Sequence, residues 1–563
     1  NELGQDYASW TFRKAPKFFD VVTWTGDGTT GRSISHNLGG TPGFIAIKAL
    51  DSVSGSSGDG SWMCCARKSD GSYAVGDGTS STSAYGFGFN KTTQSYDTTS
   101  SSNAATHITD TAFSIQYVTG SGGGTQFLGN TSGVDYVAYI FAHNDGDGDF
   151  GPDGDQDIIK CGSFTTASSV QMQSIDVGFE PQFVLLKCAS SSDNWMMIDV
   201  MRGAPTVTVY TGDSARLRAN LSDAESTDTV LHPTATGFDF RIDNTSSEYI
   251  YMAIRRGSLF PPESASEVFA IDASPNSSFP VYEAGFPVDL GIKRYDYPSD
   301  GNSNFACDRL RGSQRLFTNL ENPESSSTDV AFDSQVGWWT QPENSTSISW
   351  MWKRAPGYFD VVAYQGTGFP GFTFNHNLGV VPEMIWIKNR GATEYWPVYH
   401  KDLNGGTNPS HYYLKLNHTN AETDYNEIWN DTEPTATQVT VGQQGVVNSG
   451  SFGHIAYLFA SLDGISKVGS YTGNSGTQTI DCGFTAGARL VVVKPVSGPG
   501  NWFVWDTARG IVSGTEPYLR LNSSVAQESG YDAIDPHSSG FTLNNVGTGT
   551  NDSGTTYIFY AVA

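Results

Sequence analysis

The stretch SWTFRKAPKFFDVVTWTG, residues 9–26, returns as SWMWKRAPGYFDVVAYQG, residues 349–366. At the same offset and without a gap, SHNLGGTPGFIAIK (35–48) lies over NHNLGVVPEMIWIK (375–388). Both copies then close on similar aromatic runs, YVAYIFA (136–142) and HIAYLFA (454–460). Identities this dense do not arise by chance, so we infer a duplicated module, called A in its first copy and C in its second.

A second and more diverged pair follows these two copies. Residues 161–203 resemble residues 468–510, and the aromatic run YIYMAI (249–254) resembles YIFYAV (557–562). Repeats of this length indicate related domains and not a solenoid of short units. The predicted domains are module A (1–143), module B (144–258), a spacer module (259–348), module C (349–461, a repeat of A) and module D (462–563, a repeat of B).

The local pattern predicts strands throughout. Runs such as FIAIK, FVLLK and LVVVK are β-branched or aromatic, have the length of a strand, and are flanked by glycine or proline. No segment shows sustained helical periodicity, and 63 glycines and 24 prolines supply turns. The predicted fold class is all-β, with tandem antiparallel β-sandwich domains in two related pairs joined by a small β spacer module.

Composition excludes several classes of protein. The 563 residues carry a formal net charge of −26, which is the wrong sign for a nucleic-acid-binding surface. No apolar run reaches the length of a membrane span, so no membrane insertion is expected. Six scattered cysteines without a C-x-x-C spacing are expected to be buried free thiols, as in a protein assembled in a reducing cytoplasm.

The spacer is expected to fold, because Leu310, Leu316 and the pair Trp338-Trp339 are too apolar to remain in solvent. The first residues of the chain correspond to the late end of such a spacer. A full repeat would then be a spacer plus two domains, and we expect the chain to be a segment of a longer polypeptide.

The opening motif SW-x-[WF]-[KR]-[KR]-AP-x-[FY]-FDVV, the HNLG loop with a proline three residues on, and the strands that end in lysine resemble a module of tail-fibre-like virion structural proteins of marine bacteriophages. The resemblance is close for A and C and only in outline for B and D. It implies a structural, host-recognising virion component and supplies no catalytic residues.

The acidic run NDGDGDFGPDGDQD (144–157) is a candidate calcium site. Its carboxylates alternate with glycine and proline, and Ca²⁺ takes six to eight oxygen ligands on a flexible backbone. The EF-hand form fails, since Gln156 stands where the closing glutamate would be, and the junction of C and D has no such cluster. The alternative is a solvated acidic hinge between A and B. The candidate ligands are Asp145, Asp147, Asp149, Asp153 and Asp155.

The pairs His36-Asn37 and His376-Asn377 recur in the best-matched loop and are candidate ligand contacts. The alternative is that they hold a turn before Leu-Gly, which suits the absence of histidine at this point of B and D. Recurring tryptophans (Trp62, Trp195, Trp396 and Trp502) are expected in the core, although such rings could also stack on sugars. The spacing of Asp199 and Arg202 in B, and of Asp506 and Arg509 in D, predicts an ion pair that orders a turn and not a catalytic pair.

No nucleophile elbow, zinc-protease motif or phosphate-binding loop occurs, and we expect a protein that is not an enzyme. The predicted function is a phage virion structural protein, such as a tail fibre that contacts the host. A glycan-binding adhesin or lectin array is the alternative, and a polysaccharide-degrading tailspike a weaker one. The expected partners are further copies of the chain, most simply as a trimer, other virion proteins and a host-surface glycan or protein. No cofactor besides calcium is expected. The predicted location is the virion, after assembly in the host cytoplasm.

Overall fold

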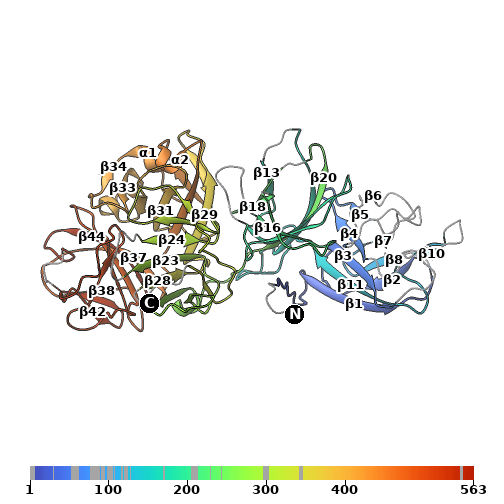
Figure 1. Ribbon diagram of the computed structural model, residues 1–563, viewed down its shortest axis with the longest axis horizontal. Helices are drawn as coiled ribbons and strands as arrows, with labels where there is room; N and C mark the ends of the chain where they lie inside the picture. The colour runs from blue at the N-terminus through green and yellow to red at the C-terminus, as the bar shows by residue number, and fades with distance from the viewer. Residues whose placement is uncertain are drawn as a thin grey trace. The chain divides into compact units, whose positions relative to one another are not determined.

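The computed structural model is nearly all β, which confirms the predicted fold class (Figure 1). It describes residues 7–29, 31–51, 62–75, 89, 96–97, 105–106, 108–115, 118–119, 125–126, 129–168, 172–204, 214–228, 230–241, 244–295, 304–340, 347–544 and 549–563. None of the helices in these residues is long and apolar enough to cross a membrane.

One strand order recurs in five modules, each with a large antiparallel sheet and a smaller second sheet. Numbered by their order in the sequence of each module, the strands of the large sheet lie side by side as first, last, third, fourth and fifth. Because the last strand lies between the first and the third, each large sheet closes only when its final strand has been added. The repeat inferred from the sequence is therefore a repeat of topology.

Module A shows the order in full. Its large sheet runs β1 (Phe19–Thr25), β11 (Asp135–Ala142), β3 (Pro42–Ala49), β4 (Trp62–Arg67), β5 (Tyr73–Val75), β6 (Tyr96–Asp97), and its other pairings are β2 (Arg32–Ser35), β8 (Ala112–Ile115), β7 (Ala105–Thr106) and β9 (Val118–Thr119) with β10 (Thr125–Gln126).

Module B repeats it with β12 (Ile159–Thr165), β20 (Glu248–Arg255), β14 (Pro181–Cys188), β15 (Met196–Asp199), β16 (Ser214–Arg218), β17 (Ser226–Asp228), and a second sheet of β13 (Met172–Asp176), β19 (Gly237–Arg241) and β18 (Leu231–Thr234).

The spacer module has the same order, although a small module was expected. Its strands are β21 (Phe269–Asp272), β28 (Ser347–Trp352), β23 (Leu290–Tyr295), β24 (Phe305–Asp308), β25 (Gln314–Phe317), β26 (Ser325–Ser326), with β22 (Tyr282–Glu283) and β27 (Gly337–Trp338) in the second sheet and the short η1 (Ala265–Glu267) before β21. Strand β28 contains Ser349-Trp350, which the sequence assigned to the start of module C. It pairs with β21 and β23 and so completes the sheet of the spacer module.

Module C begins its own sheet at Phe359. Its strands are β29 (Phe359–Gln365), β36 (Gly453–Phe459), β31 (Met384–Asn389), β32 (Pro397–His400), β33 (Tyr412–Lys415), β34 (Thr423–Asp424), with β30 (Phe372–Asn375) and β35 (Gln438–Val441) as the second sheet and four short helices, η2 (Leu403–Gly406), η3 (Pro409–His411), α1 (Asn426–Trp429) and α2 (Gly445–Asn448).

Module D ends the chain with β37 (Ser466–Thr472), β44 (Thr556–Val562), β39 (Leu490–Pro495), β40 (Phe503–Asp506), β41 (Leu519–Arg520), and a second sheet of β38 (Gln478–Asp481), β43 (Gly540–Leu543) and β42 (Ile534–His537). The predicted ion pair is confirmed here, because Arg509 Nη2 lies 2.5 Å from Asp506 Oδ2.

The chain divides into two compact units. The first comprises residues 1–199, 215–231 and 236–256, and the second residues 200–214, 232–235 and 257–563. Modules A and B supply the core of the first unit. In the second unit, one hydrophobic core runs through the large sheets of the spacer, C and D. All six cysteines are buried free thiols, as the sequence predicted.

The three modules of the second unit contact one another in a cycle. Trp396 Nε1 of C donates to the carbonyl of Phe317 in the spacer, at 3.0 Å. The matching Trp502 Nε1 of D donates to the carbonyl of Lys415 in C, also at 3.0 Å. In the spacer, Asn304 occupies this position and its Nδ2 donates to the carbonyl of Leu521 in D, at 2.8 Å. Each module therefore places one side chain against the end of the fifth strand of the next.

Candidate functional site

The repeated histidines are buried and hold their own loops. The Nδ1 atoms of His36 and His376 each accept the amide hydrogen two residues on, at 3.3 Å. Their Nε2 atoms lie 3.1 Å from the carbonyls of Thr109 and Thr435. Burial lowers the pKa of both imidazoles, which favours the neutral ring.

The neighbouring asparagines are fixed through their backbones. The amide of Asn37 donates to Asp20 Oδ2 at 2.8 Å, and the amide of Asn377 donates to Asp360 Oδ2 at 2.7 Å. The backbone of this loop is therefore held by an aspartate at the same position of both copies. Ligand binding by these four residues stays a prediction, and the contacts around them are those of a structural turn.

The acidic run 144–157 folds into a tight loop whose carboxylates bind groups of the protein. Asp157 accepts the amides of Gly146 and Gly148, at 2.8 and 2.9 Å. Lys160 pairs with Asp145 and contributes to lowering the pKa of that carboxyl, through a hydrogen bond and its charge.

A second cation serves this loop, since Lys17 Nζ lies 3.8 Å from Asp147 and 3.3 Å from Asp149. No ion pair or hydrogen bond is described for the Asp153 and Asp155 side chains. Within the described residues, no group of three or more His, Cys, Asp or Glu side chains is placed to hold a metal ion. The five predicted ligands are thus neighbours along the loop, and their calcium binding stays a prediction.

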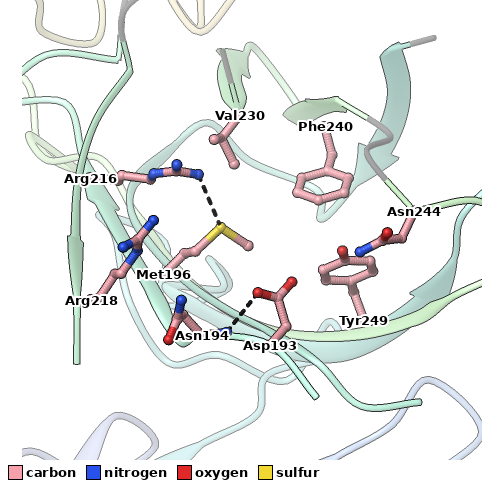
Figure 2. Close-up of a pocket in the computed structure, with 9 residues that line it drawn as sticks. All are labelled: Asp193, Asn194, Met196, Arg216, Arg218, Val230, Phe240, Asn244 and Tyr249. Atoms are coloured by element: carbon pink, nitrogen blue, oxygen red, sulfur yellow. Dashed lines mark hydrogen bonds between the residues drawn. The ribbon is translucent and has the colours of Figure 1, made fainter. Parts of the chain in front are cut away.

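The structure instead places a pocket in module B, on one face of its large sheet (Figure 2). The pocket has a volume of about 240 Å³. Because Met196 pairs with Arg218 and Ile198 with Arg216, the period of two puts both arginines on the same face. The lining residues are Asp193, Asn194, Met196, Arg216, Arg218, Val230, Phe240, Asn244 and Tyr249.

The aromatic side of the pocket is formed by strands β19 and β20. The rings of Phe240 and Tyr249 lie with centroids 4.9 Å apart, and Figure 2 shows them across the pocket from the two arginines. Phe164 packs against both rings, so this wall is supported from the first strand of the module. The wall is therefore a braced apolar surface.

The polar side is partly ordered by contacts within the module. Arg216 Nε donates to Ser226 Oγ at 3.2 Å, and its Nη1 lies 4.0 Å from Met196 Sδ. Arg218 pairs with Asp223 at 3.2 Å and keeps 29% of its side chain exposed. Two guanidinium groups are thus held at the edge of the pocket, where solvent reaches them.

The floor is set by the segment before β15. Asp193 Oδ1 accepts the amide of Asn194 at 2.7 Å, a contact drawn in Figure 2. Asn220 Nδ2 donates to Asn194 Oδ1, also at 2.7 Å, while Asn220 Oδ1 accepts the amide of Trp195 at 2.9 Å. This interlock fixes a carboxylate and a carboxamide beside the arginines.

Guanidinium groups bind carboxylates with two parallel hydrogen bonds. The rings of Phe240 and Tyr249 are almost fully buried, at 2% and 1% exposed, and bound the pocket on its apolar side. The pocket is slightly smaller than the ~300–1,000 Å³ of typical small-molecule sites, so it suits a ligand about as large as one sugar ring. Its chemistry fits a sugar that carries a carboxylate. The sequence signal for this site is the alternation of Arg216 and Arg218 in one strand, and it was not among the predicted sites.

The comparison with known families agrees with the internal repeat. Residues 9–256 and 292–563 match one family, described as "Domain of unknown function (DUF7483)". No curated protein matches the chain. The two matched stretches fall on modules A and B and on most of the second unit, including the spacer from β23 onward. The chain belongs to the DUF7483 family.

Proposed function

We propose that this protein is a structural component of a bacteriophage virion, a tail fibre or similar appendage that contacts the host surface. The observation that carries the proposal is the common core of the second unit, in which three modules of one topology contact each other in a cycle. Such a core holds three sets of loops on one rigid support. This is the work of a scaffold that positions contact surfaces.

The negative charge supports the same function. A formal charge of −26 keeps a large repetitive protein soluble at high concentration, because copies repel one another. Several weak contacts then add up through effective concentration when copies are held together. We propose a homo-oligomer, most simply a trimer, which native mass spectrometry of the purified chain measures directly.

The test is the location of the protein in purified particles. Antibody labelling of intact virions, followed by electron microscopy, is expected to mark one appendage, and mass spectrometry of gradient-purified particles is expected to detect the chain. Particles that lack the chain after purification would overturn the virion proposal, whatever the protein binds.

The pocket of module B favours a second function, the binding of an acidic glycan. The guanidinium groups of Arg216 and Arg218 line one side of this pocket, and they suit the carboxylate of an acidic sugar. Hydrogen bonds to charged groups contribute roughly 1.5–3 kcal/mol each, so the double variant R216A/R218A should bind at least tenfold more weakly.

Calorimetric titration with an oligosaccharide of uronic acids checks this proposal. The matched control is R13A, because Arg13 is an exposed arginine of the same unit outside the pocket. Equal affinity of the wild type and R216A/R218A would contradict a role for the pocket. Release of reducing ends from the oligosaccharide would favour the tailspike alternative over a binding protein.

A further inference from the structure

In the described residues, the first unit has two modules where the second unit has three. Module A corresponds to C, and module B to D, as their sequences and strand orders show. In the described part of the first unit, residues 8–12 lie at the position that strand β28 of the spacer module holds beside C and D. These residues match 348–352, the greater part of strand β28.

The matched segments are bound in the same way to their neighbours. Trp350 Nε1 donates to Asp506 Oδ2 of D at 3.0 Å, and Trp10 Nε1 donates to Asp199 Oδ2 of B at 3.1 Å. Phe12 packs against Phe141, with ring centroids 5.2 Å apart. The segment 8–12 therefore already lies where a final strand of a spacer-type sheet would lie.

The sheet around this segment differs between the two units. In the second unit, β28 is a central strand with β21 on one side and β23 on the other. In the first unit, residues 7–14 belong to no strand in the described part of the chain. The matched segment is therefore a central strand in the second unit, and it pairs with no described strand in the first.

The faces that the spacer module buries in C are partly exposed in A. Tyr457 is 1% exposed, Trp396 0% and Val361 1%. The residues at the same positions of A, Tyr139, Trp62 and Val21, are each only partly buried. Both sets lie on the side of the sheet that faces the common core, and in C the spacer module packs on this side.

We propose that residues 8–12 are the last strand of a third module of this same fold, which packs beside A and B as the spacer module packs beside C and D. A complete module, such as the spacer of a second copy, already has this position filled by its own β28. The occupant must therefore be a module with an open position between its first and third strands.

One residue also defines what the occupant presents. In C, Arg390 forms a two-point ion pair with Glu324 of the spacer module, with N–O distances of 2.7 and 2.9 Å. Module A has Leu50 at this position, and it is 59% exposed. The occupant of the first unit should accordingly carry an apolar side chain, and not a glutamate, opposite Leu50.

The test uses the full chain with one extra module. Residues 257–346, which lack β28, are joined directly to residue 7, as they are joined to residue 347 in the natural chain. The expected result is at least 100-fold slower amide hydrogen exchange in residues 8–12, because these amides become part of a central strand. Slower exchange is also expected at Tyr139, and an extra module with E324L should protect both regions further.

The matched control adds residues 257–352 through a glycine-serine linker, so that the extra module has its own last strand. This module should fold and leave residues 8–12 unprotected. No added protection from either fusion would overturn the proposal. Protection of residues 8–12 in the unmodified chain, together with a dimer in native mass spectrometry, would overturn it in favour of a second copy.

Discussion

Modules A and C share their opening strand, their HNLG loop and their closing aromatic run, yet the same positions have different environments. Lys388 of C is fully buried, and its Nζ donates to the carbonyls of Glu321 and Ala392 at 3.1 and 3.2 Å. Lys48 of A is only partly buried, with its Nζ 5.7 Å from the ring of Trp62. The difference teaches that burial here depends on how many modules meet, because the residue types are the same.

The largest difference in unfolding free energy between C and A is expected from the matched tryptophans Trp396 and Trp62. Replacing the fully buried Trp396 by alanine is expected to cost about 4 kcal/mol of unfolding free energy, since a large cavity remains at the contact with the spacer. The matched W62A should cost about 1–2 kcal/mol, because that side chain is already partly exposed. Hydrogen exchange in peptides of each unit measures both values separately, and equal costs would contradict the comparison.

The second effect concerns the buried charges between the spacer and C. Asp308 Oδ2 accepts from Arg311 Nε at 2.5 Å and from the hydroxyl of Tyr457 at 2.7 Å. D308N should cost about 3 kcal/mol, because it leaves a buried guanidinium without its carboxylate. The matched D199N should cost less, because the Asp199 side chain, which accepts from Trp10 Nε1, is more exposed than that of Asp308. Urea unfolding followed by unit-specific hydrogen exchange tells the two apart, and a larger loss from D199N would contradict the assignment.

A third effect depends on pH. His400 stands in C where Asp308 and Asp506 stand in the other two modules, and burial lowers the pKa of its imidazole to about 3. The folded state keeps the ring neutral while the unfolded state binds a proton below pH ~6.5. This contribution to stability is therefore complete above pH 6.5 and is lost as the pH falls towards 3.

Between pH 7 and pH 5 the loss should be about 2 kcal/mol, and H400Q should remove it from peptides of module C. Module A has Ala66 at the matching position, so an A66Q variant should leave the pH dependence of the first unit unchanged. Thermal melts of both variants at the two pH values give the measurement. An unchanged pH slope in H400Q would mean that another group dominates.

The smallest expected effect concerns the acidic loop between A and B, which has no counterpart between C and D. D157N should cost about 1 kcal/mol in the first unit, since it weakens the acceptor for two amides of the acidic loop. With Lys17 and Lys160 already beside the carboxylates, 1 mM Ca²⁺ should shift the melting temperature of the wild type by less than about 1 °C. A shift of several degrees, absent in a D145N/D147N variant, would support a calcium site.

The all-β class and the pairing of A with C followed from the strand-length apolar runs and the matched loops. The spacer was predicted to be a small β module, but its shared strand order was not predicted, because its third strand reads LGIKRY where C has MIWIKN and D has LVVVKP. Strand β28 was assigned to C because it directly precedes C in the sequence. Adjacency in the sequence does not show which sheet a strand joins. The pocket of module B was not predicted because its walls come from four separate strands and three loop segments.

Sequence alone determined the repeat, the class of fold and the free buried cysteines, because these depend on local patterns of apolar residues, turns and spacing. Only the tertiary structure decided that the spacer is a fifth module, that three sheets share one core, and that Arg216 and Arg218 meet Phe240 and Tyr249. Those features depend on contacts between residues up to hundreds of positions apart. The residue types only restrict which of these contacts are possible. Which of them form depends on how the strands and the modules pair.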